Sequence, residues 1–310
     1  MDERYVFFKN AIVPVSDAHV HALSPTAQFA VNVFEGIRGY WGEREQAILL
    51  FRLDEHLARL RESCRLMHLE MPFSDDETKD IIKRTIRSNG YSADIAVRLI
   101  VFIDGEGSWS TVEPASIIAA PINMDRKPAN GRSPLRATVS SWRRIDDLSL
   151  PPRVKCGANY INGRYAQLDA QAKGFDIPLF LGADGKLSEA PGACLFVVKN
   201  GTLVTPPTTA SILDSITRDT LLQLARENDL LTEVRPIDRT ELMLADEAFL
   251  CGSSAEISPI GSVDDMALGN EIGPVTQQLS DRYFHAVSGI DPKRPEWTSR
   301  VDTHQLKACQ

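Results

Sequence analysis

A proline-rich stretch interrupts the chain between residues 121 and 134. It reads PINMDRKPANGRSP, and its three prolines and one glycine disfavour a regular helix or strand. Strand-like Ala115–Ala120 precedes it, strand-like Leu135–Trp142 follows it, and each side has the length of an ordinary domain. We therefore expect a smaller N-terminal domain over residues 1–121, an interdomain linker over 122–134 and a larger domain over 135–310. The alternative is a long surface loop.

The first half of the chain contains patterns of both strands and helices. Tyr5–Phe8 and Ile48–Phe51 group aromatic and β-branched residues between polar turns, which is typical of strands. Asp54 and Ser74 are each placed to cap a helix, and the second helix is expected to end at Asn89-Gly90. Helices between separated groups of strands predict an α+β fold.

The second half contains more short strands, each bounded by Gly, Pro or Asp. These strands are Pro178–Leu181, Cys194–Val198, Leu203–Thr205, Glu247–Leu250 and Ile257–Val263. Helices are predicted over about 159–173, from Thr217 and after Gly273-Pro274. Neither half shows the regular strand–helix alternation of a doubly wound parallel sheet.

Composition excludes several classes of protein. The 34 Lys and Arg residues against 42 Asp and Glu give a net charge of −8, which argues against binding to nucleic acid or anionic membranes. No apolar run approaches the roughly 20 residues that span a bilayer, and MDERYVFFKN lacks the layout of a signal peptide. The five scattered cysteines indicate free thiols in a reducing cytosol. We expect a cytoplasmic protein.

The common catalytic and metal-binding motifs are missing from the sequence. It contains no G-x-G-x-x-G after a strand, no P-loop and no G-x-S-x-G. His19 and His21 form a lone H-x-H, which is more typical of solvated loop histidines than of a metal site. We expect no bound metal.

One lysine has an unusual setting. A lysine at the edge of a helix is usually a solvated surface charge, but Lys155 lies in V-K-C-G-A-N-Y among small and apolar residues. In such a setting the pKa of a lysine falls, and the free amine becomes a nucleophile. Tyr160 places a phenol near whatever this lysine holds.

The segment around Lys155 resembles the lysine motif of the fold-type IV pyridoxal-phosphate enzymes, the branched-chain aminotransferase group. Further segments agree with motifs of that group in the right order. They are Phe34-Glu35-Gly36-Ile37-Arg38 (F-E-G-I-R), His56–Leu60 (H-x-x-R-L), Ser188-Glu189, Thr205-Pro206-Pro207 with Ile216–Asp219 (T-P-P…I-T-R-D), and Asp246-Glu247 with Gly252–Ile257. The resemblance spans about residues 5 to 285.

This resemblance implies a fold and a reaction. The fold is α+β, with a smaller N-terminal α/β sandwich domain, a larger C-terminal pseudo-barrel α/β domain and pyridoxal 5'-phosphate between them. The reaction is transamination between an amino acid and a 2-oxo acid, with a branched-chain L-amino acid and 2-oxoglutarate as the expected pair. A homodimer at least is implied.

The resemblance also assigns the residues that bind the cofactor. Lys155 would bind it covalently and then move the Cα proton. Glu189 would keep the ring nitrogen protonated, and Tyr160 would bond the phenolate oxygen. Thr217 opens a predicted helix, whose N-terminus favours an anion. The implied phosphate ligands are Arg59, Ile216, Thr217 and Ser253.

Substrate-binding residues follow from the same resemblance. The backbone N–H groups of Ser254 and Ala255 would bind the α-carboxylate, and Phe34 would line the side-chain pocket. Arg98 would meet the distal carboxylate of glutamate or 2-oxoglutarate. It lies in an apolar strand, A-V-R-L-I-V-F, where burial of an unpaired charge is costly. Arg38 belongs to the F-E-G-I-R motif, and its role, structural or catalytic, stays open.

Several positions depart from the pattern of the group. Cys194 stands where many members have asparagine, and Asp214-Ser215 replaces the usual Pro-Gly. Phe29 and Ala96 each occupy a place that is often held by tyrosine. The alternatives are therefore a D-amino-acid or amine transaminase, or an enzyme like aminodeoxychorismate lyase with the same fold. A non-catalytic relative would lack Lys155 or Glu189, and both are present.

Overall fold

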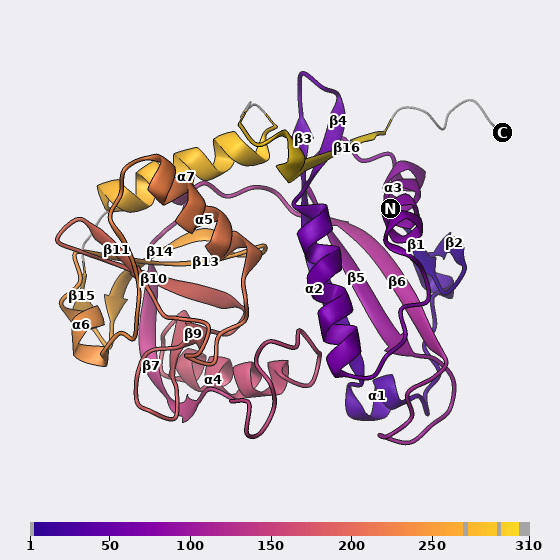
Figure 1. Ribbon diagram of the computed structural model, residues 1–310, viewed down its shortest axis with the longest axis horizontal. Helices are drawn as coiled ribbons and strands as arrows, with labels where there is room; N and C mark the ends of the chain where they lie inside the picture. Colours follow the sequence, from indigo (N-terminus) through magenta and orange to yellow (C-terminus); the bar gives the residue numbers. More distant parts are fainter. Residues whose placement is uncertain (1–2, 269–271, 290–292, 304–310) are drawn as a thin grey trace. The chain divides into compact units, whose positions relative to one another are not determined.

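The structure is a computed structural model that describes residues 3–268, 272–289 and 293–303. Two compact units divide the chain (Figure 1). The first unit comprises residues 1–126, 154–158 and 285–310, and the second comprises 127–153 and 159–284. No helix in the described ranges is long and apolar enough to cross a membrane.

The first unit is built on a seven-stranded sheet, counted over the described residues, in the order β16-β4-β3-β5-β6-β1-β2. The strands are β1 Tyr5–Phe8, β2 Ala11–Pro14, β3 Asn32–Gly42, β4 Ala47–Phe51, β5 Ile95–Ile103, β6 Ala115–Asn123 and β16 Thr298–Asp302. The short helices here are η1 Val15–Asp17, α1 Pro25–Phe29 and η3 Pro295–Trp297. Helices α2 (Leu53–Leu66) and α3 (Asp75–Asn89) share one apolar core with this sheet.

The two long helices of the first unit begin in different ways. Ser74 caps α3 in a capping box with Glu77, and α3 ends at Gly90 in the left-handed conformation, as predicted. The predicted cap at Asp54 is wrong. Helix α2 is preceded by Arg52, at φ 50°, with no side-chain capping bond, and Asp54 lies inside its first turn. A carboxylate in that turn still interacts favourably with the helix dipole.

The second unit contains a mixed nine-stranded sheet, again over the described residues. Its order is β12-β11-β10-β13-β14-β7-β8, with β9 on β10 and β15 on β14. The strands are β7 Leu135–Arg143, β8 Ile177–Leu181, β9 Glu189–Ala190, β10 Ala193–Lys199, β11 Thr202–Thr205, β12 Thr232–Val234, β13 Glu247–Gly252, β14 Glu256–Val263 and β15 Met266–Ala267. The helices are η2 Ala129–Gly131, α4 Tyr160–Ala172, α5 Ile216–Glu227, α6 Arg239–Met243 and α7 Pro274–Val287. The five strands predicted in this half are confirmed to within two residues.

The units differ from the predicted division into 1–121, 122–134 and 135–310. Strand β16 pairs with β4 in the first sheet, where Figure 1 shows the yellow strand beside a purple one, and residues 154–158 also belong to the first unit. Strand β6 continues through Pro121 to Asn123. Because β1 pairs with β6 only at Ile118 and Ala119, Pro121 lies where the ladder with β1 needs no N–H donor.

Candidate functional site

Lys155 is held in the first unit by a short extended segment that pairs with β3. Strand β4 covers only Gly39–Gly42 of β3, which leaves the start of β3 open on that edge. There the Phe34 N–H donates to the Lys155 carbonyl at 2.9 Å, and Val33 forms a bridge with Cys156. A Cβ at Gly157 would lie 2.9 Å from the end of the Asn32 side chain, so a larger residue here would have to displace that amide.

The neighbours of Lys155 anchor it in the core. Val154 and Cys156 are buried in the apolar core of the first unit, whereas Lys155 between them is half-buried. Successive residues of an extended segment face opposite sides, so the two anchors direct the lysine to the other side. Its Nζ lies 5.0 Å from the centre of the ring of Phe34, the residue expected to line the side-chain pocket.

Arg98 shares this aromatic ring. Its Cζ lies 4.9 Å from the centre of the Phe34 ring. On neighbouring strands it is opposite Gly36 and Ala120, and a Cβ at Gly36 would meet no atom within 4 Å. Small neighbours therefore leave open space beside the guanidinium.

The expectation that Arg98 is buried in its strand is wrong. The side chain is exposed, although most of β5 is buried. Across the described parts of the chain, no carboxylate lies within ion-pair distance of its guanidinium. Because the Arg98 guanidinium is accessible to solvent, it can bind a carboxylate of a ligand.

Arg59 is bound to a buried carboxylate of the F-E-G-I-R motif. Its Nε and Nη2 donate to the two oxygens of Glu35 at 2.7 and 2.8 Å, and His56 Nδ1 lies 2.7 Å from Glu35 Oε2. Glu35 is fully buried on the face of β3 that carries apolar residues. Burial opposes its ionisation, but Arg59 and His56 outweigh that effect and hold its pKa well below the usual range. The expected phosphate ligand Arg59 is thus oriented by Glu35.

Burial is also the main cause of the lowered pKa of His56. The charges of Arg59 and Lys155 lower it further, whereas Glu35 opposes them. The ring is therefore neutral at pH 7, and its Nδ1–H donates to Glu35. Neither Glu35 nor His56 has a role among the expectations from the sequence, although the sequence carries two signals for them: a glutamate between apolar strand positions, and the i, i+3 spacing of H-x-x-R.

Arg38, whose role was left open, is buried in the first unit. Its Cζ lies 5.0 Å from the centre of the Tyr40 ring, and the Cζ of Arg126 lies 5.4 Å from the same centre. Arg126 in turn pairs with Asp94 at 2.6 Å. These contacts favour a structural part for Arg38 within the sheet.

Glu189 is a buried carboxylate of the second unit. Arg144 Nη2 lies 2.7 Å from its Oε1, and the Leu213 N–H donates to both oxygens at 3.3 Å. The Arg144 guanidinium also lies over the Phe180 ring, 5.7 Å from its centre. An opposite charge and an N–H donor favour the ionised carboxylate in a buried place. Arg144 was missed because nothing in its local sequence points to a residue 45 positions further along the chain.

Two departures from the family pattern lie at this carboxylate and at α5. Cys194 is opposite Glu189 on β10, and its thiol donates to Glu189 Oε2 at 3.7 Å. Burial, followed by the charge of Glu189, raises the pKa of Cys194 well above its usual value. Ser215 caps α5, where its Oγ accepts the Arg218 N–H at 3.2 Å. At both departures, the residue present therefore forms a hydrogen bond with a neighbouring polar group.

The expected phosphate ligands Ile216 and Thr217 form the first turn of α5. Arg218 beside them is buried and donates to Thr205 Oγ1 and to the Pro206 carbonyl at 3.1 and 2.8 Å. This contact joins the T-P-P segment to I-T-R-D and fixes the helix N-terminus. Unpaired N–H groups at such an end favour an anion.

The turn between β13 and β14 carries three further expected residues, Ser253, Ser254 and Ala255. It lies next to Gly192, since a Cβ at Gly252 would be 3.2 Å from the Gly192 carbonyl oxygen. A Cβ at Gly192 would in turn lie 3.8 Å from Cε1 of Tyr160. The second unit thus brings Tyr160, the turn and the strand after Glu189 together.

Both units carry groups that fit pyridoxal phosphate. The second unit provides a buried carboxylate for a protonated ring nitrogen, a phenol, and a helix N-terminus with hydroxyls for a phosphate. The first unit provides an amine beside an aromatic ring. In the described ranges no group of three His, Cys, Asp or Glu side chains could hold a metal ion.

Comparison with known proteins agrees with this set of groups. The family model described as amino-transferase class IV matches residues 32–263. The chain is 35% identical over 301 residues to a probable branched-chain-amino-acid aminotransferase of Aquifex aeolicus, with 96% of each chain covered. It is 33% identical to the branched-chain-amino-acid aminotransferase of Salmonella typhimurium, covering 96% of this chain and 98% of the relative.

Solved structures show the same similarity. The branched-chain amino acid aminotransferase of Thermobaculum terrenum in its PLP form has a TM-score of 0.91 and 38% identity, over 96% of this chain and 98% of that one. The branched-chain aminotransferase of Thermoproteus uzoniensis with norvaline also has a TM-score of 0.91, with 33% identity over 96% and 99%.

Proposed function

Since the chain belongs to the amino-transferase class IV family and is a pyridoxal-phosphate-dependent aminotransferase, we propose that it transfers the amino group of branched-chain L-amino acids to 2-oxoglutarate. The Phe34 ring carries this proposal, because Lys155 Nζ and Arg98 Cζ lie 5.0 and 4.9 Å from its centre. An aliphatic side chain can pack on the ring, and a distal carboxylate can reach the exposed guanidinium. One place can therefore accept both substrates in turn.

The residues of the chain have separate tasks in this reaction. When bound, pyridoxal phosphate supplies a carbonyl that accepts the amino group and a ring that withdraws electrons. Lys155 binds the cofactor covalently and moves the proton at the substrate Cα. Glu189, paired with Arg144, would hold the proton on the ring nitrogen. Tyr160 donates to the phenolate oxygen.

The remaining expected site residues bind anions. The N–H groups of Ile216 and Thr217, the hydroxyls of Thr217 and Ser253, and the charge of Arg59 would hold the phosphate. The N–H groups of Ser254 and Ala255 bind the α-carboxylate of the substrate. The neutral His56 and the ionised Glu35 fix the position of Arg59 from behind.

Arg98→Ala tests the choice of acceptor. We expect kcat/KM for 2-oxoglutarate to fall by about 100-fold, since one charge-assisted carboxylate contact contributes roughly 1.5–3 kcal/mol. The value for a monocarboxylic branched-chain 2-oxo acid should change less than threefold. Steady-state kinetics with both acceptors measures this difference. Equal losses with both would remove Arg98 from the acceptor site.

The same kinetics with a panel of donors separates the remaining alternatives. Activity with leucine, isoleucine and valine supports the proposal, and preference for a D-amino acid or an amine would contradict it. Release of pyruvate from aminodeoxychorismate without an acceptor would identify a lyase instead.

We also propose that the enzyme is a cytoplasmic homodimer. Several large apolar side chains of the first unit are exposed, among them Leu23, Phe29, Trp109 and Val112, at 49%, 46%, 72% and 46%. The loop with Trp109 and the segment with Leu23 are joined by a Gly107 N–H bond to the Leu23 carbonyl. Grouped exposed apolar residues are typical of an interface. Sedimentation equilibrium should give twice the mass of the 34.3 kDa chain.

A further inference from the structure

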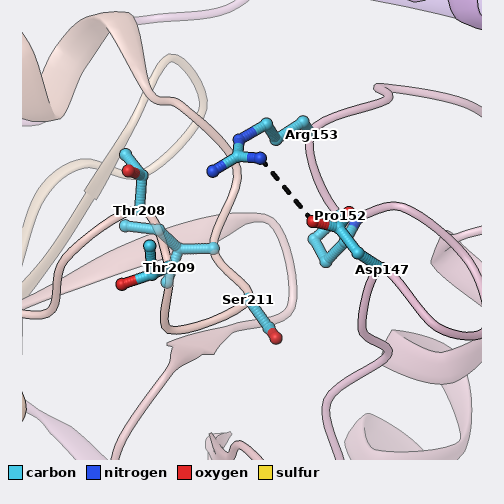
Figure 2. A pocket seen from close by; sticks show the side chains of 7 residues that line it. Asp147, Pro152, Arg153, Thr208, Thr209 and Ser211 are labelled. Atoms are coloured by element: carbon cyan, nitrogen blue, oxygen red, sulfur yellow. Dashed lines mark ion pairs between the residues drawn. The ribbon is translucent and has the colours of Figure 1, made fainter.

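A pocket of about 250 Å³ lies within the second unit and contains none of the residues discussed above (Figure 2). One wall is the segment between β7 and α4, with Asp147, Pro152 and Arg153. The other wall is the segment between β11 and α5, with Thr208, Thr209, Ser211 and Ile212. The pocket is smaller than the roughly 300–1,000 Å³ of sites for drug-sized ligands, so it suits a small molecule.

The pocket combines one cation with three hydroxyl groups. Arg153 lies on one side of the pocket, and Thr208, Thr209 and Ser211 lie on the other, with the Ser211 hydroxyl turned away from Arg153 (Figure 2). None of these hydroxyls has a hydrogen-bond partner among the residues that the structure describes. They are available to a ligand without the loss of an existing bond.

The ion pair that Arg153 makes is weak. Its Nη1 lies 3.6 Å from Asp147 Oδ2, and the two side chains are 49% and 62% exposed. Exposed pairs of this kind contribute about 0–1 kcal/mol. A bound anion can therefore displace Asp147 at little cost.

We propose that this pocket binds a phosphate group, either as inorganic phosphate or as a small phosphate monoester. A phosphate has enough acceptor oxygens for a forked guanidinium and for hydroxyl groups of the opposite wall. The site lies on a chain with a net charge of −8, so its selectivity for an anion comes from local geometry and not from the overall field.

Both walls of the pocket lead to groups that hold Glu189. Arg144, three residues before Asp147, pairs with Glu189 at 2.7 Å. Leu213, next to Ile212, donates its N–H to both Glu189 oxygens at 3.3 Å. A phosphate that draws the two walls together shifts both groups, and it therefore changes how firmly Glu189 holds a proton on the cofactor ring. This coupling, unlike the binding itself, rests on the proposed function of Glu189.

Titration of the holoenzyme in chloride buffer tests the binding. The bound cofactor already fills its own phosphate site, so added inorganic phosphate or glycerol 3-phosphate reports on the pocket. Isothermal calorimetry should give saturable binding that Arg153→Gln weakens at least tenfold. Arg164→Gln, an exposed arginine of α4, is the matched control and should change affinity less than twofold. Equal affinity of the Arg153 variant and the unmutated enzyme would overturn the site.

The two probes distinguish the sources of the phosphate group. Binding of both supports a site open at one end, which also accepts the ester. Binding of inorganic phosphate alone supports a site closed around the free ion, and binding of neither contradicts the proposal.

The pH titration of the absorbance of the bound cofactor tests the coupling. Saturating phosphate should shift the midpoint of this pH titration in the unmutated enzyme and should leave it unchanged in the Arg153→Gln variant. If phosphate binds through Arg153 and the midpoint stays in place, the coupling is wrong. If the Glu189→Gln variant has the same midpoint as the unmutated enzyme, Glu189 does not set this titration. The failure then belongs to the proposed function of Glu189 and not to the pocket.

Discussion

At the scale of single residues, chemistry depends on how the neighbours of a group hold it. Lys155 owes its place to Val154 and Cys156, which are buried on either side of it. Glu189 is held in place by Arg144 and by the Leu213 N–H. These two residues differ in how a substitution should act, because in the proposed reaction one forms a bond to the cofactor and the other holds a proton.

Lys155→Ala should abolish the covalent link to the cofactor and lower turnover by several orders of magnitude. The phosphate ligands remain, so the variant should still bind pyridoxal phosphate non-covalently. Borohydride reduction of the unmutated enzyme, followed by peptide mass mapping, should place the label on Lys155. A label on Lys173 or Lys186 would contradict the assignment.

Glu189→Gln should retain the cofactor but lose most of its turnover, because a neutral amide does not hold the ring proton electrostatically. We expect kcat to fall by about 100-fold or more, in line with the loss of one well-placed electrostatic contact. Glu62→Gln, an exposed glutamate on α2, is the control and should leave kcat unchanged. A near-native kcat for the Glu189 variant would mean that another group protonates the ring.

At the scale of elements, β3 and α2 are joined by the buried network of Glu35, His56 and Arg59. The folded pKa of His56 is lowered, so below about pH 6.5, its ordinary value, the unfolded chain binds a proton more readily than the folded one. The pKa of Glu35 in the folded protein is also lowered. The loss of stability therefore extends to pH values below 4.5, the ordinary pKa of a glutamate. This network stabilises the protein at neutral pH and is weakened by acid.

We therefore expect the free energy of unfolding to fall as the pH decreases from 7 to 5. Urea titrations at several pH values measure it. His56→Gln should reduce this dependence, whereas His68→Gln, at an exposed position, should keep it. If both variants have the slope of the unmutated protein, His56 does not control acid stability.

At the scale of the whole molecule, burial protects the thiols. Cys64, Cys156, Cys194 and Cys251 are all buried, and none of them is in a disulfide within the described part of the chain. Burial raises the pKa of Cys64 to about 12, and it raises the pKa values of Cys194 and Cys251 as well. A buried, protonated thiol is a poor nucleophile.

We predict that none of these four thiols reacts with a disulfide reagent at pH 8 in the native protein. All four should react in denaturant, and peptide mapping identifies each one. Fast labelling of Cys194 in the native state would show that the surroundings of Glu189 open to solvent.

The sequence by itself determined the local elements and the family. Strand β1 and the capped ends of α3 follow from neighbouring residues, and the motifs identified the fold, the enzyme class and the cofactor that the comparisons confirm. Such signals are local, because strand propensity and helix caps act within a few residues.

Only the tertiary structure decided which distant residues meet. Strand β16 pairs with β4 some 250 positions earlier, and Arg144 meets Glu189 from another element. The same holds for the exposure of Arg98, which depends on what covers each face of the first sheet. Long-range pairing depends on the summed packing of the whole core, and a single strand or side chain carries no record of its partner in its own sequence.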